Sequence, residues 1–150
     1  MGLDELSSGR EAYAAVKVKL NLAHFTAVSA AAYQRAVKVE LGFAVIEDAV
    51  SLFHLAERWC HSGILQLKGN MLMSSAPDQW AGAETCFHEA LQIAHRQEAK
   101  SLELHVATSG GEQNRRAEAR DLLAPIYDLF TEGFDTADLK DAKALLDELS

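Results

Sequence analysis

Histidine and cysteine are the side chains here best suited to hold a metal ion, and their spacing argues against a metal site. The six histidines are His24, His54, His61, His88, His95 and His105. His88 and His95 stand seven residues apart, which on one helix separates them by about 10.5 Å along the axis, too far to share one zinc ion. Cys60 and His61 are neighbours, so their side chains diverge by about 100° on a helix. Neither H-x-x-x-H nor C-x-x-C occurs, and the sequence predicts no metal ligands.

Nucleotide-binding and nucleophile motifs are also missing from the sequence. No G-x-x-x-x-G-K-[ST] or G-x-S-x-G is present. Gly110-Gly111 is too short to cradle phosphate and lacks a following lysine, so we interpret it as a helix stop. Ser62-Gly63 beside His61 is a weak serine–histidine pairing that fits the start of a helix better. We therefore expect a chain with no catalytic residues and no cofactor.

The charge balance argues against two classes of partner. A formal net charge of −8 disfavours a nucleic-acid backbone or an anionic membrane surface. From Glu112 onward, ten Asp and Glu stand against five Lys and Arg, which is typical of a solvated outer face. Arg115, Arg116 and Arg120 form a basic cluster that we interpret as a solvated helix start.

Three features favour the cytoplasm. Cys60 and Cys86 both lie inside helical patterns, where reduced, buried thiols are expected. Residues 1–10 carry Asp4, Glu5 and Arg10 and have no apolar stretch typical of a secretory signal. No apolar run approaches the roughly 18 residues needed to span a bilayer.

Any surface that binds a partner must be positioned by helices, because Ala, Leu and Glu dominate and alternating strand patterns are scarce. Apolar residues recur at intervals of three and four positions, which predicts an all-α fold of about eight helices in a single domain. The expected units are an unpaired first helix at 3–16, helix pairs at about 22–57, 59–96 and 100–130, and a capping helix at 136–149. Trp59 and Trp80 fall at helix starts and are interpreted as packing residues.

One pattern of small and large residues occurs three times, at offsets of 41 and 36 residues. Each copy has a small residue, a large apolar residue four later, and an apolar pair three further on. The copies are Gly42, Ile46, Ala49 and Val50; Ala83, Phe87, Ala90 and Leu91; and Ala119, Leu123, Ile126 and Tyr127. Such a period indicates stacked helix pairs in which small residues allow close crossing. Ala30 and Gly69 supply the matching small positions on the preceding helices.

This arrangement resembles the tetratricopeptide repeat. The residues that carry the resemblance are Leu65, Gly69, Leu72, Ala83, Phe87 and Ala90, with Ala30, Tyr33, Gly42, Ile46 and Ala49 in the earlier copy. The resemblance implies antiparallel helix pairs stacked into a short right-handed superhelix that binds a protein or peptide and has no catalytic role.

A closer likeness covers most of the chain. The stretches 64–69, 83–91, 99–104, 117–127 and 130–136 resemble the C-terminal repeat region of large bacterial signalling ATPases, of the adenylate-cyclase-like or transcriptional-regulator type. The likeness implies a regulatory module of a larger protein. The chain departs from that pattern at 109–115, where about one helical turn is missing. It also departs at Pro125-Ile126, where proline should kink the helix.

In repeats of this kind the first helix of each pair lines an inner groove. Mapping the pattern onto this chain selects eight candidate partner-binding residues: His24, Gln34, Arg35, Gln66, Asn70, Met73, His105 and Thr108. Most are polar and able to hydrogen-bond, and methionine is an adaptable apolar contact. Such a groove suits an extended peptide or a helix.

Two alternatives remain open at this point. The chain could be an oligomerisation module in which Leu3 and Leu6 of the first helix meet a second copy, giving a homodimer. It could also be a small-ligand sensor with a pocket between helices. The acids within apolar stretches, Glu47, Asp48 and Glu89, are expected to face outward, which disfavours an enzyme.

Overall fold

The computed structural model describes residues 2–16, 21–52, 58–75, 79–111 and 116–149. Within these ranges the chain is all-helical, with no strand, which confirms the predicted fold class at that level. The elements are α1 (Gly2–Ala15), α2 (Leu22–Arg35), α3 (Val39–Ser51), the 3-10 turn η2 (Arg58–Cys60), α4 (His61–Ser75), α5 (Trp80–Arg96), α6 (Lys100–Gly111), α7 (Arg116–Tyr127) and α8 (Ala137–Glu148).

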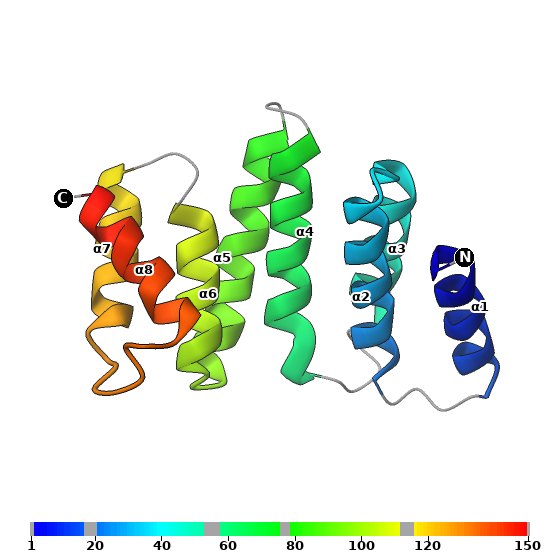
Figure 1. Cartoon of the computed structure of the whole chain (residues 1–150), viewed down its shortest axis with the longest axis horizontal. Helices are drawn as coiled ribbons and strands as arrows, with labels where there is room; N and C mark the ends of the chain where they lie inside the picture. The colour runs from blue at the N-terminus through cyan, green and yellow to red at the C-terminus, as the bar shows by residue number, and fades with distance from the viewer. Residues whose placement is uncertain (1, 17–20, 53–57, 76–78, 112–115, 150) are drawn as a thin grey trace.

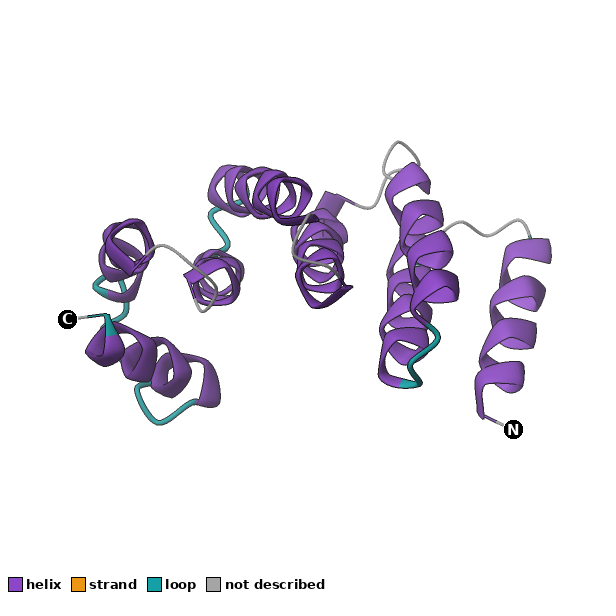
Figure 2. Cartoon of the chain, turned by 90° about the horizontal axis from the view of Figure 1, so that it is seen from above, coloured by secondary structure: helices purple, strands orange, loops and turns teal. Residues whose placement is uncertain are grey.

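The helices follow one another along the long axis of the molecule, and the two ends of the chain lie at opposite ends of the row (Figures 1 and 2). Each helix from α1 to α8 contacts the next one in the chain, and α2 also contacts α4, α4 contacts α6, and α6 contacts α8. The buried apolar residues form separate clusters, one centred on α2, α3 and α4 and another on α6, α7 and α8. The core is therefore distributed along the row.

Small residues allow the closest helix crossings. A Cβ added to Gly42 in α3 would lie 3.4 Å from the Ala30 carbonyl oxygen of α2. A Cβ added to Gly69 in α4 would lie 2.8 Å from the Phe87 ring of α5. Ala30 and Ala90 are fully buried, and the Ser62 hydroxyl of α4 donates to the Ala90 carbonyl of α5 over 2.9 Å. These four small positions, which were selected from the sequence, thus lie where neighbouring helices meet.

The helices α2 and α5 end in the same cap. Val37, just after α2, has a φ of 59°, and the Lys38 N–H donates to the Tyr33 carbonyl over 2.9 Å. This bond defines a Schellman motif, whose left-handed position usually holds glycine. Glu98 closes α5 with a φ of 53°. Two identical caps make two similarly tight turns, from α2 to α3 and from α5 to α6.

Three sequence expectations concern the ends or the interior of helices. The helix stop predicted at Gly110-Gly111 coincides with the last described residues of α6, which is described as far as Gly111. Pro125 lies inside α7, which continues to Tyr127. The expected end of the third helix at 53–57 falls outside the described residues.

Candidate functional site

Several of the eight candidate residues bridge alternate helices. The Gln34 side-chain amide of α2 donates to the Ser74 hydroxyl of α4 over 3.1 Å. The Gln66 amide of α4 donates to the His105 carbonyl of α6 over 3.0 Å and to the Ser109 hydroxyl over 2.8 Å. These bonds place α2, α4 and α6 side by side, which agrees with the contacts between alternate helices.

The bridging continues to the last helix. His105 Nε2 of α6 lies 3.1 Å from Asp138 Oδ2 of α8, and both side chains are about half exposed. One line of polar contacts therefore runs across α2, α4, α6 and α8. We call the surface that carries it the even-helix face. Gln34, Gln66 and His105 act as braces within this face, because their polar atoms are bonded across it.

The other candidates on this face have different surroundings. Asn70 and Met73 of α4 and Thr108 of α6 are half-buried, and the Thr108 hydroxyl donates to the Leu104 carbonyl of its own helix over 2.9 Å. Arg35, in the last turn of α2, is exposed. It lies eleven residues beyond His24, roughly 16 Å along the helix axis, so the structure does not bring these two residues together.

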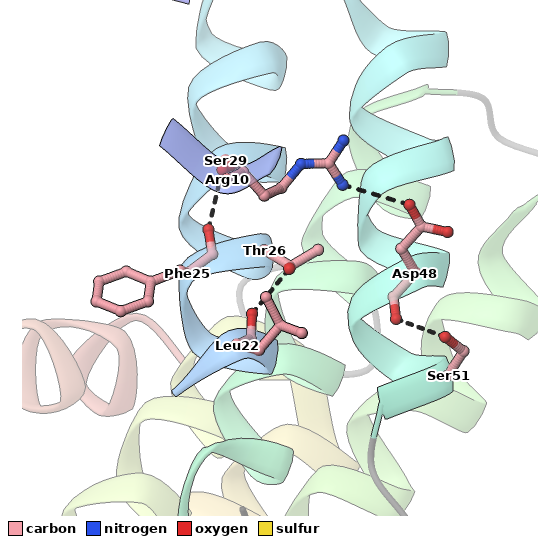
Figure 3. A network of polar contacts seen from close by, with 7 residues as sticks. All are labelled: Arg10, Leu22, Phe25, Thr26, Ser29, Asp48 and Ser51. Atoms are coloured by element: carbon pink, nitrogen blue, oxygen red, sulfur yellow. Dashed lines mark hydrogen bonds and ion pairs between the residues drawn. The ribbon is translucent and has the colours of Figure 1, made fainter. Parts of the chain in front are cut away.

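His24 instead belongs to a chain of rings. Its ring centroid lies 5.1 Å from that of Trp59 in η2 and 6.0 Å from that of Phe25. Phe25 in turn meets Tyr13 of α1 edge-to-face, with centroids 5.2 Å apart. The Phe25 ring points away from α3 (Figure 3). Three helical segments thus contribute aromatic groups to one surface.

Sequence reasoning missed part of this surface. Trp59 was expected to pack inside, but it is 54% exposed, so that interpretation was wrong. Phe25 and Val28 are 45% and 46% exposed. A signal was present: α2 has no charged residue before Arg35 and carries apolar residues on every side. Because α2 has no charged residue before Arg35 to cover its outer side, apolar side chains such as Phe25 and Val28 lie at the surface.

Burial is the main cause of the pKa shifts of His61 in α4 and Cys86 in α5. It lowers the pKa of His61 from its ordinary value, and the charge of Arg58 adds to that effect. Burial raises the pKa of the Cys86 thiol, with Glu89 and Glu47 adding to the rise and Lys68 opposing it. Both cysteines are buried, and they form no disulfide with each other. Both pKa shifts therefore follow from the burial of these side chains between packed helices.

An open pocket of about 360 Å³ lies between α1, α2 and α3. Arg10 of α1 and Asp48 of α3 stand on its walls and approach to 3.4 Å (Figure 3). The Thr26 hydroxyl donates to the Leu22 carbonyl over 2.7 Å, and the Ser51 hydroxyl donates to the Asp48 carbonyl over 2.7 Å. Because these polar side chains bond within the fold, the pocket offers little support for the small-ligand alternative.

Three further observations bear on function. Among the described residues, no three or more His, Cys, Asp or Glu come together as metal ligands would, and no helix is long and apolar enough to cross a membrane. The acids Glu47, Asp48 and Glu89 are exposed, as expected from helical phase. Comparison of the chain with protein-family models, with curated proteins and with solved structures finds no match.

Proposed function

We propose that the chain is a non-catalytic helical-repeat scaffold of the tetratricopeptide type, which binds a protein or peptide on its even-helix face. The line of contacts from Gln34 to Asp138 carries this proposal, because it joins α2, α4, α6 and α8 into one continuous surface. A stack of helix pairs presents the same helix of every pair on one side, and such surfaces bind extended ligands.

The braces and the contact groups on this face have separate tasks in the proposal. Gln34, Gln66 and His105 hold the alternate helices in register. Asn70 and Arg35 meet the partner, with Met73 as an adaptable apolar contact and with His24 and Thr108 completing the surface. We further propose that the chain is a regulatory part of a larger bacterial signalling protein in the cytoplasm. Its repeats would pass a binding event to a neighbouring domain.

Site-specific photo-crosslinking tests the proposed face. A photoreactive amino acid replaces Asn70 on α4 in one variant and Gln92, an exposed residue of α5, in a matched control. Expressed in its native cells, the position-70 variant should cross-link a partner protein that the position-92 variant does not. Equal cross-linking from both positions, or stronger cross-linking from position 92, would contradict the assignment of the face.

The second candidate function is oligomerisation through α1. It is favoured by one observation: no residue of α1 is buried. Leu3 packs against the core cluster of its own chain, so Leu6 is the better candidate for contact with a second copy. The molar mass measured by light scattering during serial dilution tests this alternative, and a monomer at every concentration down to the nanomolar range would exclude it.

A further inference from the structure

The even-helix face carries an exposed apolar strip at its N-terminal end. It consists of Phe25, Val28 and Trp59, each close to half exposed, together with His24, whose ring lies against those of Phe25 and Trp59. Exposed Trp and Phe side chains that gather on one surface are typical of an interface core, where aromatic residues are enriched. We call these four residues the aromatic strip.

The two stretches of chain that hold the strip have no acid, whereas the sequence between them contains Glu40, Glu47, Asp48 and Glu57. Residues 21–38 and 58–75 contain four Lys and Arg and no Asp or Glu. Because the whole chain has a net charge of −8, the remaining residues together carry −12. Lys68 forms an ion pair with Glu47 over 2.8 Å, so its charge is matched within the fold. The exposed cations of these two stretches are Arg58, which adjoins Trp59 in the sequence, and Arg35 and Lys38, which lie at and just beyond the far end of α2.

The geometry fits a short stretch of chain. Positions 24, 28, 31 and 35 share one face of α2 and span roughly 16 Å, about the length of five extended residues. Ala31, half-buried and small, leaves room for a backbone between Val28 and Arg35. The Gln97 side-chain amide donates to the Arg58 carbonyl, which ties η2 to the end of α5 and holds Trp59 in place. The surface is therefore formed before any partner arrives.

We propose that the aromatic strip docks an acidic peptide segment bearing a large apolar side chain. The apolar group would lie against Phe25 and Trp59, and the acidic groups would meet Arg35 and Arg58. This inference rests on the proposed function and deepens it by naming the chemistry of the partner. Charge complementarity carries the choice of occupant, because the two stretches that hold the strip contain Lys and Arg but no Asp or Glu in a strongly anionic chain.

Selection from a displayed library of random twelve-residue peptides, with the full chain as target, tests the proposal. The enriched peptides should be net negative and contain Trp, Phe or Leu. The outcome is informative because the net charge of −8 would by itself attract basic peptides. Enrichment of basic or uncharged peptides, or no enrichment over the starting library, would overturn the proposal.

Two pairs of variants locate the binding. Phe25→Ser and Arg35→Gln should each weaken binding of a synthetic selected peptide by about tenfold or more, as expected for anchor residues. Phe134→Ser and Arg120→Gln should leave it unchanged, because Phe134 is similarly exposed at 48% and Arg120 is an exposed arginine of α7. Arg35→Gln changes an exposed side chain, so it reports on binding even if Phe25→Ser disturbs folding.

The failure of this inference can be told apart from failure of the proposed function. If Phe25→Ser and Arg35→Gln bind the peptide normally while the photoreactive group at Asn70 still cross-links a partner, the even-helix face stands and the strip proposal fails. If neither selected peptides nor cross-links are obtained, both proposals fail. If Phe25→Ser instead converts an oligomer into a monomer, a second copy of the chain covers the strip and the peptide proposal is overturned.

Discussion

Replacing Gly69 with alanine tests the close packing of α4 on α5. The new Cβ would lie 2.8 Å from Phe87 Cε1, 2.9 Å from Cζ and 3.1 Å from Cδ1, so three ring atoms would have to move. Gly63 lies in the same helix, and a Cβ added there meets nothing within 4 Å. The two glycines thus form a matched pair: they lie in the same helix and receive the same substitution, but only Gly69 is packed against a neighbouring side chain.

The magnitudes follow from two opposing effects. Glycine to alanine in a helix gains up to about 1 kcal/mol from propensity, and we expect Gly63→Ala to raise the free energy of unfolding by about half of that, since it lies in the first turn. Overpacking a close contact costs about 1–3 kcal/mol, so Gly69→Ala should lower the free energy of unfolding by up to about 2 kcal/mol. The difference between the two variants therefore measures the packing effect.

Urea unfolding followed by far-UV circular dichroism and by tryptophan fluorescence gives both free energies, provided that the two probes agree. A double variant Gly69→Ala with Phe87→Leu serves as the check, because removing the ring should make the added methyl group far less costly. If Gly69→Ala is as stable as Gly63→Ala, α4 and α5 do not approach as closely as described, and the small-residue argument for the helix pairs fails.

Other predictions concern the caps, the thiols and the response to acid. Val37→Gly should raise the free energy of unfolding by about 1 kcal/mol in urea titrations, because Val37 is β-branched, has a left-handed backbone and is 83% exposed. Glu98→Gly should raise it by less. A lower free energy of unfolding for Val37→Gly would contradict the described cap. Cys60 and Cys86 should react slowly with Ellman's reagent in the native chain and quickly in urea, because both are buried and burial raises the pKa of Cys86; rapid native reaction would contradict this. Burial lowers the pKa of His61 in the folded state, so folding favours the neutral imidazole. The contribution of neutral His61 to the free energy of unfolding is therefore complete above pH 6.5, the ordinary pKa, and is lost as the pH falls below it. In His61→Gln, the free energy of unfolding should therefore fall less between neutral and mildly acidic pH than in the unchanged chain. The same pH dependence in both proteins would contradict this role of His61.

The helices themselves could be predicted well because their signals are local. The recurrence of apolar residues at intervals of three and four positions located every α-helix that the structure describes. The small residues Ala30, Gly42 and Ala90 proved to be buried. The left-handed Val37 was beyond sequence reasoning, because a β-branched residue seldom adopts that backbone and the cap bonds that hold it depend on where α3 begins.

The candidate site was less accessible because burial depends on which helices surround a side chain. Trp59 looked like a packing residue at a helix start, yet η2 leaves it at the surface beside His24. The acceptors of Gln66 are a backbone carbonyl of α6 and Ser109, and the partner of His105 is Asp138. Sequence spacing cannot give such pairings, because they join residues of different helices that are 33 to 43 positions apart.

The double role of the even-helix face limits how its residues can be tested. Gln66 appeared from sequence to be a contact for a partner, but its amide bonds twice to α6, so Gln66→Ala would leave a half-buried acceptor unpaired and loosen α4 from α6. A loss of binding in that variant would then report the stack as much as the contact. Asn70 lies one helical turn further along the same helix. Its substitution separates recognition from bracing, since binding should fall while the free energy of unfolding stays close to that of the unchanged chain.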